Sequence, residues 1–469
     1  MERAVAERRR GFSGITAALA VMLLLANELA WSAELRAGAA AVKITPPLGV
    51  SMAGYYSARA SESVHDDLFA KALVLEKDGE KAALVVLDII RTHREIVERA
   101  REEIEKTTGM KGDHVMISAT HSHTGPEIDT KSFRAKAFGS TKTVTVEYAQ
   151  SLPRLIAEAV RQAEAALTPV KASAAIGHED SIAFNRRYHM KDGTVGWNPG
   201  KLNPNIVKPA GAIDPAVPVV YFEAAKSRPV ATYVNYAVHL DNVGGMEISA
   251  DMPHTVSKCL TDVKGKEMVV IYATGCCGDI NHVDVNWAEK QKGHENAARM
   301  GIILAGEVLR TFPKLRTIEP GALRARSEIV RLPLPKVTPE EVAKAREDVK
   351  SSQFLTKVNA FKVLDVAARE SKPLEVEVQV IALGDDIAWV SLPGEIFVEL
   401  GLAIKEKSPF KNTIIAELAN GSIGYIPSRR AYPQGNYEVV SARCAEGSGE
   451  LLVDTAARLL KELHRANQE

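Results

Sequence analysis

The chain has 469 residues, of which 46% are hydrophobic and 25% are charged, a composition typical of globular proteins. Its 59 basic and 59 acidic residues cancel, so the basic excess that general nucleic-acid binding requires is absent from the sequence. The 4 cysteines are too few for a disulfide scaffold. Adjacent Cys276 and Cys277 are poorly placed to bridge each other, whereas Cys259 and Cys444 are compatible with either a disulfide or buried free thiols.

The first 33 residues have the order of a secretory signal peptide. Basic residues Arg8–Arg10 precede an apolar run from Ile15 to Ala26, and small residues around Ala30 and Ala33 offer a cleavage zone. The run is roughly 12 residues long, short of the roughly 20 that span a bilayer. We therefore predict a signal peptide over residues 1–33 and a secreted or periplasmic protein, with an uncleaved membrane anchor as the less favoured alternative.

Strand and helix patterns alternate from about Gly38 onward. Two apolar runs separated by a turn predict a hairpin, and Thr92 with Glu95 forms a capping-box pattern before an amphipathic helix. The predicted strands are Lys71–Glu76, Ala82–Leu87, Val115–Thr120, Val219–Phe222, Val230–Val238, Met268–Ala273, Val376–Leu383, Ile387–Leu392 and Ile414–Leu418. The predicted helices are Glu147–Ala165, a charged one opening at Thr338 and a closing one over Leu451–Leu463.

These elements predict a single α/β domain over residues 34–469, with a mixed sheet and flanking helices. Hairpins that alternate with helices argue against a purely parallel sheet. The charged helical stretch Pro333–Pro373 is predicted to be an insertion into this domain.

Side chains suited to metal binding or acid–base chemistry follow several predicted strands. Val115–Thr120 runs directly into His121 and His123, and residues i and i+2 of an extended chain face the same side. Another strand ends at His239, and a third meets Pro-Gly and then Glu395. Two histidines and a carboxylate form a known catalytic zinc set that leaves a position open for water. Each histidine alone is also compatible with a surface or hydrogen-bonded core position.

A glycine-rich turn follows the strand Met268–Ala273. It carries Gly278, Asp279 and Asn281, and its backbone N–H groups are candidates to stabilise an oxyanion, although a tight capping turn is an equal alternative. Tyr425 and Tyr437 lie in a later loop rich in glycine and proline, where tyrosines more often pack and hydrogen-bond than catalyse.

Taken together, these runs resemble the catalytic domain of the neutral/alkaline ceramidases, secreted zinc-dependent amidases that cleave the N-acyl bond of ceramide. The similarity covers nearly the whole chain after residue 33, in order. The matching runs are Lys43–Pro47, Met52–Tyr55, His65–Ala72, Ser118–Pro126, Asn185-Arg186, Asn235–His239, Ser249–Asp251, Gly278-Asp279, Pro393–Glu395, Tyr425 and Tyr437-Glu438.

The resemblance implies roles for individual residues. It implies a Zn²⁺ ion held by His121, His239, Glu395 and Tyr425, with water as the alternative fourth ligand. It implies that His123 and Tyr437 are further active-site groups and that Arg186 contacts the substrate side. We also predict Glu395 and Asn281 among the catalytic residues, and Gly278 and Asp279 among those that bind substrate.

Three departures from the family pattern bear on specificity. Asn281 aligns with a serine that acts in the family's catalysis, and an amide is no nucleophile although it can hydrogen-bond substrate. The sequence ends soon after Glu438, so we expect no C-terminal immunoglobulin-like domain. No apolar surface helix for engaging membrane lipid is evident from the sequence.

We therefore predict an exported zinc hydrolase that cleaves an N-acyl amide, ceramide or a related one, with a zinc-bound water. The expected partner is a small amide or lipid, with no nucleic acid and no integral membrane segment after signal removal. One alternative is hydrolysis of another amide or ester, such as a glycan or cell-wall derivative. An alternative of another class is a metal-containing binding protein without catalysis.

Overall fold

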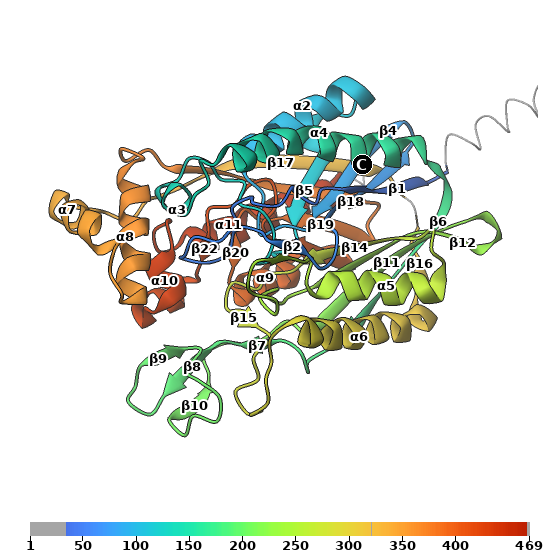
Figure 1. Cartoon of the computed structure of the whole chain (residues 1–469). Coiled ribbons are helices and arrows are strands. Elements are labelled where there is room, and N and C mark those ends of the chain that lie inside the picture. The colour runs from blue at the N-terminus through green and yellow to red at the C-terminus, as the bar shows by residue number, and fades with distance from the viewer. Residues whose placement is uncertain (1–33, 320, 467–469) are drawn as a thin grey trace, which may run out of the picture.

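The computed structural model describes residues 34–319 and 321–466, so the predicted signal peptide lies outside the described residues. Two mixed sheets form the centre of the molecule (Figure 1). The larger has nine strands in the order β14-β12-β11-β6-β1-β3-β4-β5, with β16 paired to β6. They are β1 (Arg36–Lys43), β3 (Phe69–Lys77), β4 (Glu80–Leu87), β5 (Val115–Ala119), β6 (Thr168–His178), β11 (Ala216–Ala224), β12 (Arg228–Tyr236), β14 (Val269–Thr274) and β16 (Arg316–Thr317).

Parallel pairing occurs at the two ends of this sheet, where β4 pairs with β5 and β12 pairs with β14. The pairs between them are antiparallel, and the predicted hairpin is the β3–β4 pair. The mixed sheet expected from the sequence is therefore confirmed. The sheet also curls, because β14 at one end contacts β4 and β5 at the other, and the Thr274 hydroxyl donates to the Thr120 carbonyl at 2.7 Å.

A second sheet, which the sequence did not separate from the first, has four strands in the order β17-β18-β19-β21. Its apolar face packs on the large sheet, so that Trp389 and Ile414 share one buried cluster with Leu73 and Leu84. Helices α9 and α11 cover its other face. These elements are β17 (Leu323–Leu332), β18 (Leu374–Leu383), β19 (Ile387–Ser391), β21 (Asn412–Ala416), α9 (Val398–Lys407) and α11 (Ser448–Arg465).

Four helices cover the outer face of the curled large sheet, two along the top and two along the bottom of the view in Figure 1. They are α2 (Arg94–Thr108), α4 (Thr143–Ala165), α5 (Met252–Lys264) and α6 (His294–Thr311). With α9 and α11 on the far face of the second sheet, the packed layers run helix–sheet–sheet–helix. Within the described residues, no helix combines the length and apolarity needed to cross a membrane. All four cysteines are free.

The predicted capping box at the start of α2 is wrong. The N-cap residue is His93, and it makes no side-chain capping bond. The Thr92 hydroxyl instead donates to the Leu418 carbonyl at 2.7 Å and accepts from the Gly421 N–H at 2.9 Å. A tertiary contact thus uses the hydroxyl that the local pattern assigned to the helix end.

The segment predicted as an insertion forms a helical hairpin between β17 and β18. It consists of α7 (Pro339–Asp348), with a complete capping box from Thr338 and Glu341, and α8 (Phe354–Ala367). Several short elements complete the described residues, and some of them contribute side chains to the site described below. They are α3 (Phe133–Ala137), α10 (Tyr437–Ser441), β8 (Arg187–Met190), β9 (Val195–Trp197), β10 (Ile206–Pro209) and the pairs β2 (Ser63–Val64) with β13 (Glu247–Ile248), β7 (Phe184–Asn185) with β15 (Ile280–Asn281), and β20 (Glu395–Ile396) with β22 (Tyr425–Ile426).

Candidate metal centre and active site

His121 and His123 follow β5 and are held by backbone contacts. His121 has φ of 76°, a left-handed conformation that a residue other than glycine adopts at a cost of order 1–3 kcal/mol. Its Nδ1 donates to the Ile90 carbonyl at 2.7 Å, so that Nε2 is the nitrogen directed into the site. His123 Nε2 lies 3.3 Å from His121 Nε2. The strained turn therefore presents both rings at the strand end.

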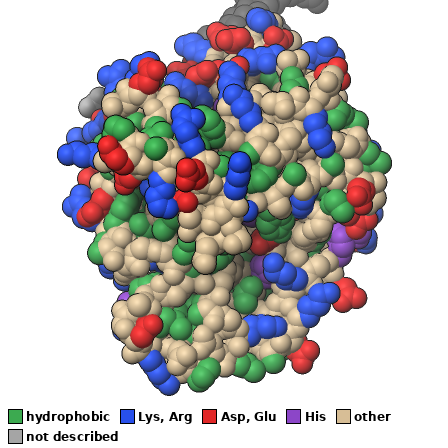
Figure 2. Space-filling model, turned by 60° about the vertical axis from the view of Figure 1, so that its left-hand side comes forward, with side chains coloured by type: hydrophobic (Ala, Val, Ile, Leu, Met, Phe, Trp, Pro, Cys, Tyr) green, Lys and Arg blue, Asp and Glu red, His purple; other side chains and the backbone are tan. Residues whose placement is uncertain are grey.

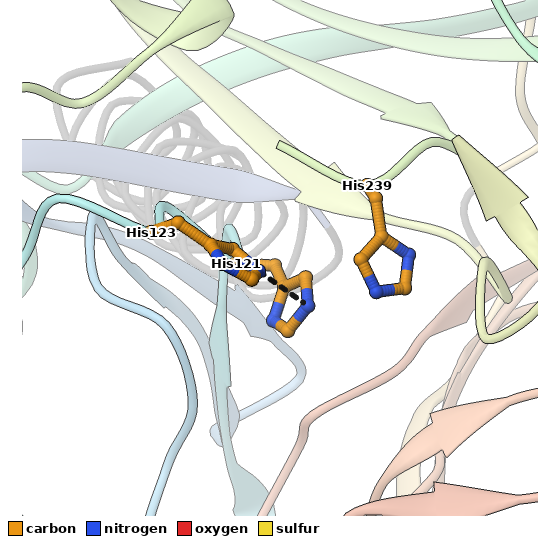
Figure 3. Close-up of side chains that lie close together, drawn as sticks. All are labelled: His121, His123 and His239. Atoms are coloured by element: carbon orange, nitrogen blue, oxygen red, sulfur yellow. Dashed lines mark hydrogen bonds between the residues drawn. The ribbon is translucent and has the colours of Figure 1, made fainter. Parts of the chain in front are cut away.

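His239 follows β12 and reaches the same point from the other side of the curled sheet. Its Nδ1 donates to the Cys277 carbonyl at 2.7 Å, so that its Nε2 is also free to bind a ligand. Burial, together with nearby Arg186, lowers the His239 pKa to about 3, and the ring is neutral at pH 7. Figure 3 shows His121 and His123, from one segment, close to His239, which comes from another.

Glu395 and Tyr425 complete the cluster from two short parallel strands. They are direct partners in the β20–β22 pair, so both side chains project from one register position. Glu395 Oε2 lies 3.2 Å from His239 Nε2 and 3.5 Å from His121 Nε2, and the Tyr425 hydroxyl lies 3.3 Å from His239 Nε2. Burial opposes ionisation of Glu395, but the two imidazoles outweigh it and hold its pKa well below the usual range.

These positions form a group that could hold a metal ion. The ligand atoms of His121, His123 and His239 lie within 4.8 Å of one another. His65, Asp66 and His294 form a second such group, but the His65 and His294 rings stack face to face at 3.7 Å instead of aiming at one point. Asp66 already accepts hydrogen bonds from the Ser249 hydroxyl and the Ala250 N–H. Only the first group has buried donors that converge.

The glycine-rich turn after β14 supports Glu395 from behind. A Cβ at Gly278 would lie 2.5 Å from the Glu395 carbonyl oxygen, so only glycine fits there. The Gly278 N–H donates to the Ile396 carbonyl at 2.8 Å and is not available to an oxyanion in this conformation. Asp279 accepts from the Val398 N–H and from the Asn185 amide, each at 2.8 Å. Both residues, predicted on the substrate side, here anchor the strand that carries Glu395.

Glu417 is a supporting residue that the sequence analysis missed. It is fully buried, and its carboxyl accepts from the Cys277 N–H at 3.1 Å and from the Ile396 N–H at 2.8 Å. Cys277 holds His239, and Ile396 follows Glu395, so one carboxyl links both halves of the cluster. Burial raises its pKa well above the usual range. A lone glutamate after a strand carries no local signal of this role.

Arg186 lies beneath the two tyrosines. Its Nε donates to Glu438 at 2.8 Å, its Nη2 donates to the Gly278 carbonyl at 2.7 Å, and its guanidinium lies 5.4 Å from the Tyr425 ring centre. Tyr437 meets the Tyr425 ring edge-on at 5.3 Å. The predicted substrate arginine thus also organises the tyrosines, and its role toward substrate stays a prediction.

Asn281 lies on β15 beside the cluster. Its side-chain amide donates to the side-chain Oδ1 of Asn198 at 2.9 Å, and its own Oδ1 accepts from the Val283 N–H at 3.0 Å. The next residue, His282, is 2% exposed, and neither ring nitrogen has a hydrogen-bond partner within the described part of the chain. Asn281 therefore holds a loop at the edge of the site.

A pocket opens onto the cluster. Basic side chains and a histidine border a hollow on the face that comes forward in Figure 2. The sequence analysis missed its arginines, although Arg91 follows β4, the parallel neighbour of the strand that ends at His121, and the same strand-end argument applies to it. The lining side chains include Tyr56, Arg91, His121, His123, Arg134, Glu395, Tyr425, Tyr437 and Arg443.

Comparison with solved structures connects this geometry to known enzymes. The neutral ceramidase from Pseudomonas aeruginosa superposes with a TM-score of 0.74 at 19% identity, over 92% of this chain and 75% of that one. The chain has the fold of the neutral ceramidases. A ceramidase complexed with C2 superposes with a TM-score of 0.74 at 18% identity, over 92% of this chain and 76% of that one. The ceramidase fold expected from the sequence is thereby confirmed.

Comparisons by sequence add nothing to this result. No protein-family model matches the chain, and no curated protein matches it. The link to the ceramidases therefore rests on structure and on the motifs identified above.

Proposed function

We propose that residues 34–469 form a zinc-dependent hydrolase of the neutral ceramidase type, which cleaves an N-acyl amide bond such as that of ceramide or a related amide. The observation that carries the proposal is the spacing of four donor atoms, the Nε2 atoms of His121 and His239, Glu395 Oε2 and the Tyr425 hydroxyl. The measured separations among them are 3.2, 3.3 and 3.5 Å.

This spacing fits zinc. Zinc–nitrogen and zinc–oxygen bonds of about 2.0–2.1 Å in a tetrahedron place neighbouring ligand atoms about 3.3 Å apart. Both ring nitrogens that face away from the cluster donate to backbone carbonyls, an arrangement that orients metal-binding histidines in proteins. Tyr425 is the weakest of the four donors, because burial raises its pKa well above the usual range, and water in its place is the alternative.

The surrounding residues support amide hydrolysis. When bound, zinc supplies a Lewis acid that polarises a carbonyl and lowers the pKa of water. Burial lowers the His123 pKa to about 4, so the ring is neutral at pH 7 and can accept a proton from water and pass it to the leaving amine. Asp241 lies 3.7 Å from His123 Nδ1 and stabilises the protonated ring. Tyr437 lines the pocket, where its hydroxyl can donate to a developing oxyanion.

Export belongs to the same proposal. The basic flank Arg8–Arg10 and the apolar run that follows it support cleavage of a signal peptide and a secreted or periplasmic enzyme. N-terminal sequencing of the protein from its native host should give a start between about Ala30 and Leu35. A chain that begins at Met1 in the cytosol would contradict export.

Metal analysis combined with hydrolysis of a fluorogenic ceramide tests the function. We expect about one zinc per chain, with activity lost on chelation and restored by zinc. A panel of amides and esters, run in parallel, separates ceramide cleavage from hydrolysis of another amide or ester. Bound zinc without turnover of any substrate would favour a metal-containing binding protein, and a chain without transition metal would refute the site.

A further inference from the structure

Three arginines line the pocket beside the metal cluster. Arg91 follows β4, Arg134 lies on α3, and Arg443 follows α10, so three separate segments contribute them. Their side chains are 17%, 11% and 21% exposed, respectively. Guanidinium groups are costly to bury without partners, so the location of their counter-charges decides what they do.

The counter-charges lie behind the pocket. Glu127 pairs with Arg91 at 3.0 Å and with Arg134 at 3.4 Å, and Asp365 pairs with Arg443 at 2.6 Å. Neither acid lines the pocket. Asp129, which also faces Arg91, is held by the N–H groups of its own loop and does not line the pocket either. Glu395 is the one acid on the pocket wall, and it belongs to the metal cluster.

Two of the arginines retain free donors. Arg91 donates to Glu127 through Nη2 alone, and Arg134 likewise donates to Glu127 through Nη2 alone. Their Nε and Nη1 groups have no hydrogen bond to protein within residues 34–319 and 321–466. Glu127 also accepts from the Ile128 and Asp129 N–H groups, so it does not depend on both guanidiniums for its own hydrogen bonds. The charge is compensated from behind, while N–H donors remain toward the pocket.

The lining of this pocket contains little apolar surface on which a long aliphatic chain could pack. Ile90 is the one aliphatic side chain of appreciable size among the lining residues, and Tyr56, Tyr425 and Tyr437 supply the aromatic surface. Planar guanidinium forks match the oxygen pairs of carboxylates and phosphates, and hydrogen bonds to such charged groups are stronger than neutral ones. Bound zinc would add further positive charge beside them.

We propose that the substrate carries an anionic group, a carboxylate or a phosphate, that binds to the free donors of Arg91 and Arg134 beside the scissile amide, while Arg443, whose nitrogens already bond to Asp365 and Ser441, adds positive charge. The inference rests on the proposed function for the hydrolysis, whereas the anion site itself rests on the pocket alone. It makes the preferred substrate an acidic N-acyl amide, with the charge on either the amine or the acyl side.

The test is binding of matched probes to the metal-free protein, in which a carboxylate cannot ligate zinc. N-hexanoylglycine is compared with N-hexanoylethanolamine, and N-ethyladipamic acid with N-ethylhexanamide. We expect the anionic member of at least one pair to bind about 10- to 100-fold more tightly, as for a hydrogen bond to a charged group, with a ratio that falls at high salt. Inorganic phosphate and acetate as competitors distinguish a phosphate site from a carboxylate site.

Arg134→Gln should abolish most of the affinity ratio between anionic and neutral probes. Glu127 keeps Arg91 as its partner, while the pocket loses one guanidinium group. Arg134→Lys should recover part of the ratio, since charge is restored without the planar donors. Arg161→Gln is the matched control, because Arg161 pairs with Glu158 on the exposed face of α4. If Arg134→Gln does not fold, Arg91→Gln replaces it. Equal affinities within both pairs, or a ratio that Arg134→Gln and Arg91→Gln leave intact, would overturn the inference.

The two proposals fail in different ways. Hydrolysis of neutral amides by the zinc-loaded protein without any anion preference removes the inference and leaves the proposed function. Anion-selective binding without hydrolysis of either probe pair or of ceramide removes the proposed function and leaves the anion site.

Discussion

The replacement His239→Ala tests the metal cluster most directly. His239 contacts both Glu395 and Tyr425, so its loss removes one of four donors and leaves a shell that water must complete. Structural zinc sites bind with about 10–16 kcal/mol, which is roughly 2.5–4 kcal/mol for each of four ligands. We therefore expect zinc affinity to fall by about 100- to 1000-fold, because 1.36 kcal/mol is a factor of ten.

The assay is zinc competition against a chelating dye, followed by metal analysis and amide turnover of the same samples. His178→Ala is the control, since the His178 side chain is 67% exposed and lies on β6 away from the cluster. Circular dichroism and thermal unfolding of the metal-free proteins show whether the variant is folded. A folded His239→Ala protein that binds zinc as tightly as the wild type would refute the assignment of this cluster as the metal centre.

Three further predictions concern residues in and around the cluster. Gly278→Ala should destabilise the protein by about 1–3 kcal/mol and weaken zinc binding, because the added Cβ meets the Glu395 carbonyl. Gly306→Ala in α6 is the control and should be neutral or stabilising, because open space surrounds that position. Chemical denaturation and zinc titration of both variants test this prediction. His282 is buried with a pKa lowered to about 4, so between about pH 6.5 and 4 its ring binds protons in the unfolded state but not in the folded state. The unfolding free energy of wild type relative to His282→Gln should therefore decrease by about 3 kcal/mol as pH falls through that window. A difference between the two unfolding free energies that stays constant with pH would contradict this. Asn281→Ala should keep measurable turnover at about a 10- to 100-fold loss, while Glu395→Gln should be far worse, and equal losses at full zinc content would require a direct catalytic role for the loop.

Local patterns in the sequence predicted much of the fold. The β3–β4 hairpin, the strand before His121 and the helix that opens at Thr338 follow from periodicity and from contacts within a few residues. They formed as expected because the hydrogen bonds that define them join neighbouring residues of the chain. The Thr92 cap failed for the opposite reason, since a carbonyl 326 residues away takes the hydroxyl.

His121, His239 and Glu395 were also visible in the sequence as candidate ligands, because each follows an apolar strand, whereas Tyr425 was named only through the family resemblance; the convergence of the four was not visible. His121 and His239 follow strands near opposite ends of the large sheet, and they meet only because that sheet curls until β14 contacts β5. Glu395 arrives from the second sheet, which the periodicity of single strands does not distinguish from the first. Sheet curvature and the packing of one sheet on another depend on contacts among many strands at once.

What the sequence by itself determined is therefore the set of chemical groups and the strand ends that carry them. What only the tertiary structure decided is their spacing, their support and the character of the pocket. Glu417 links the two halves of the cluster through backbone N–H groups that no side-chain motif records. Arg91, Arg134 and Arg443 lie far apart in the chain and form one wall only when β4, α3 and the segment after α10 come together. Such a wall is a property of the folded surface, because the energy of each buried charge depends on neighbours from other segments.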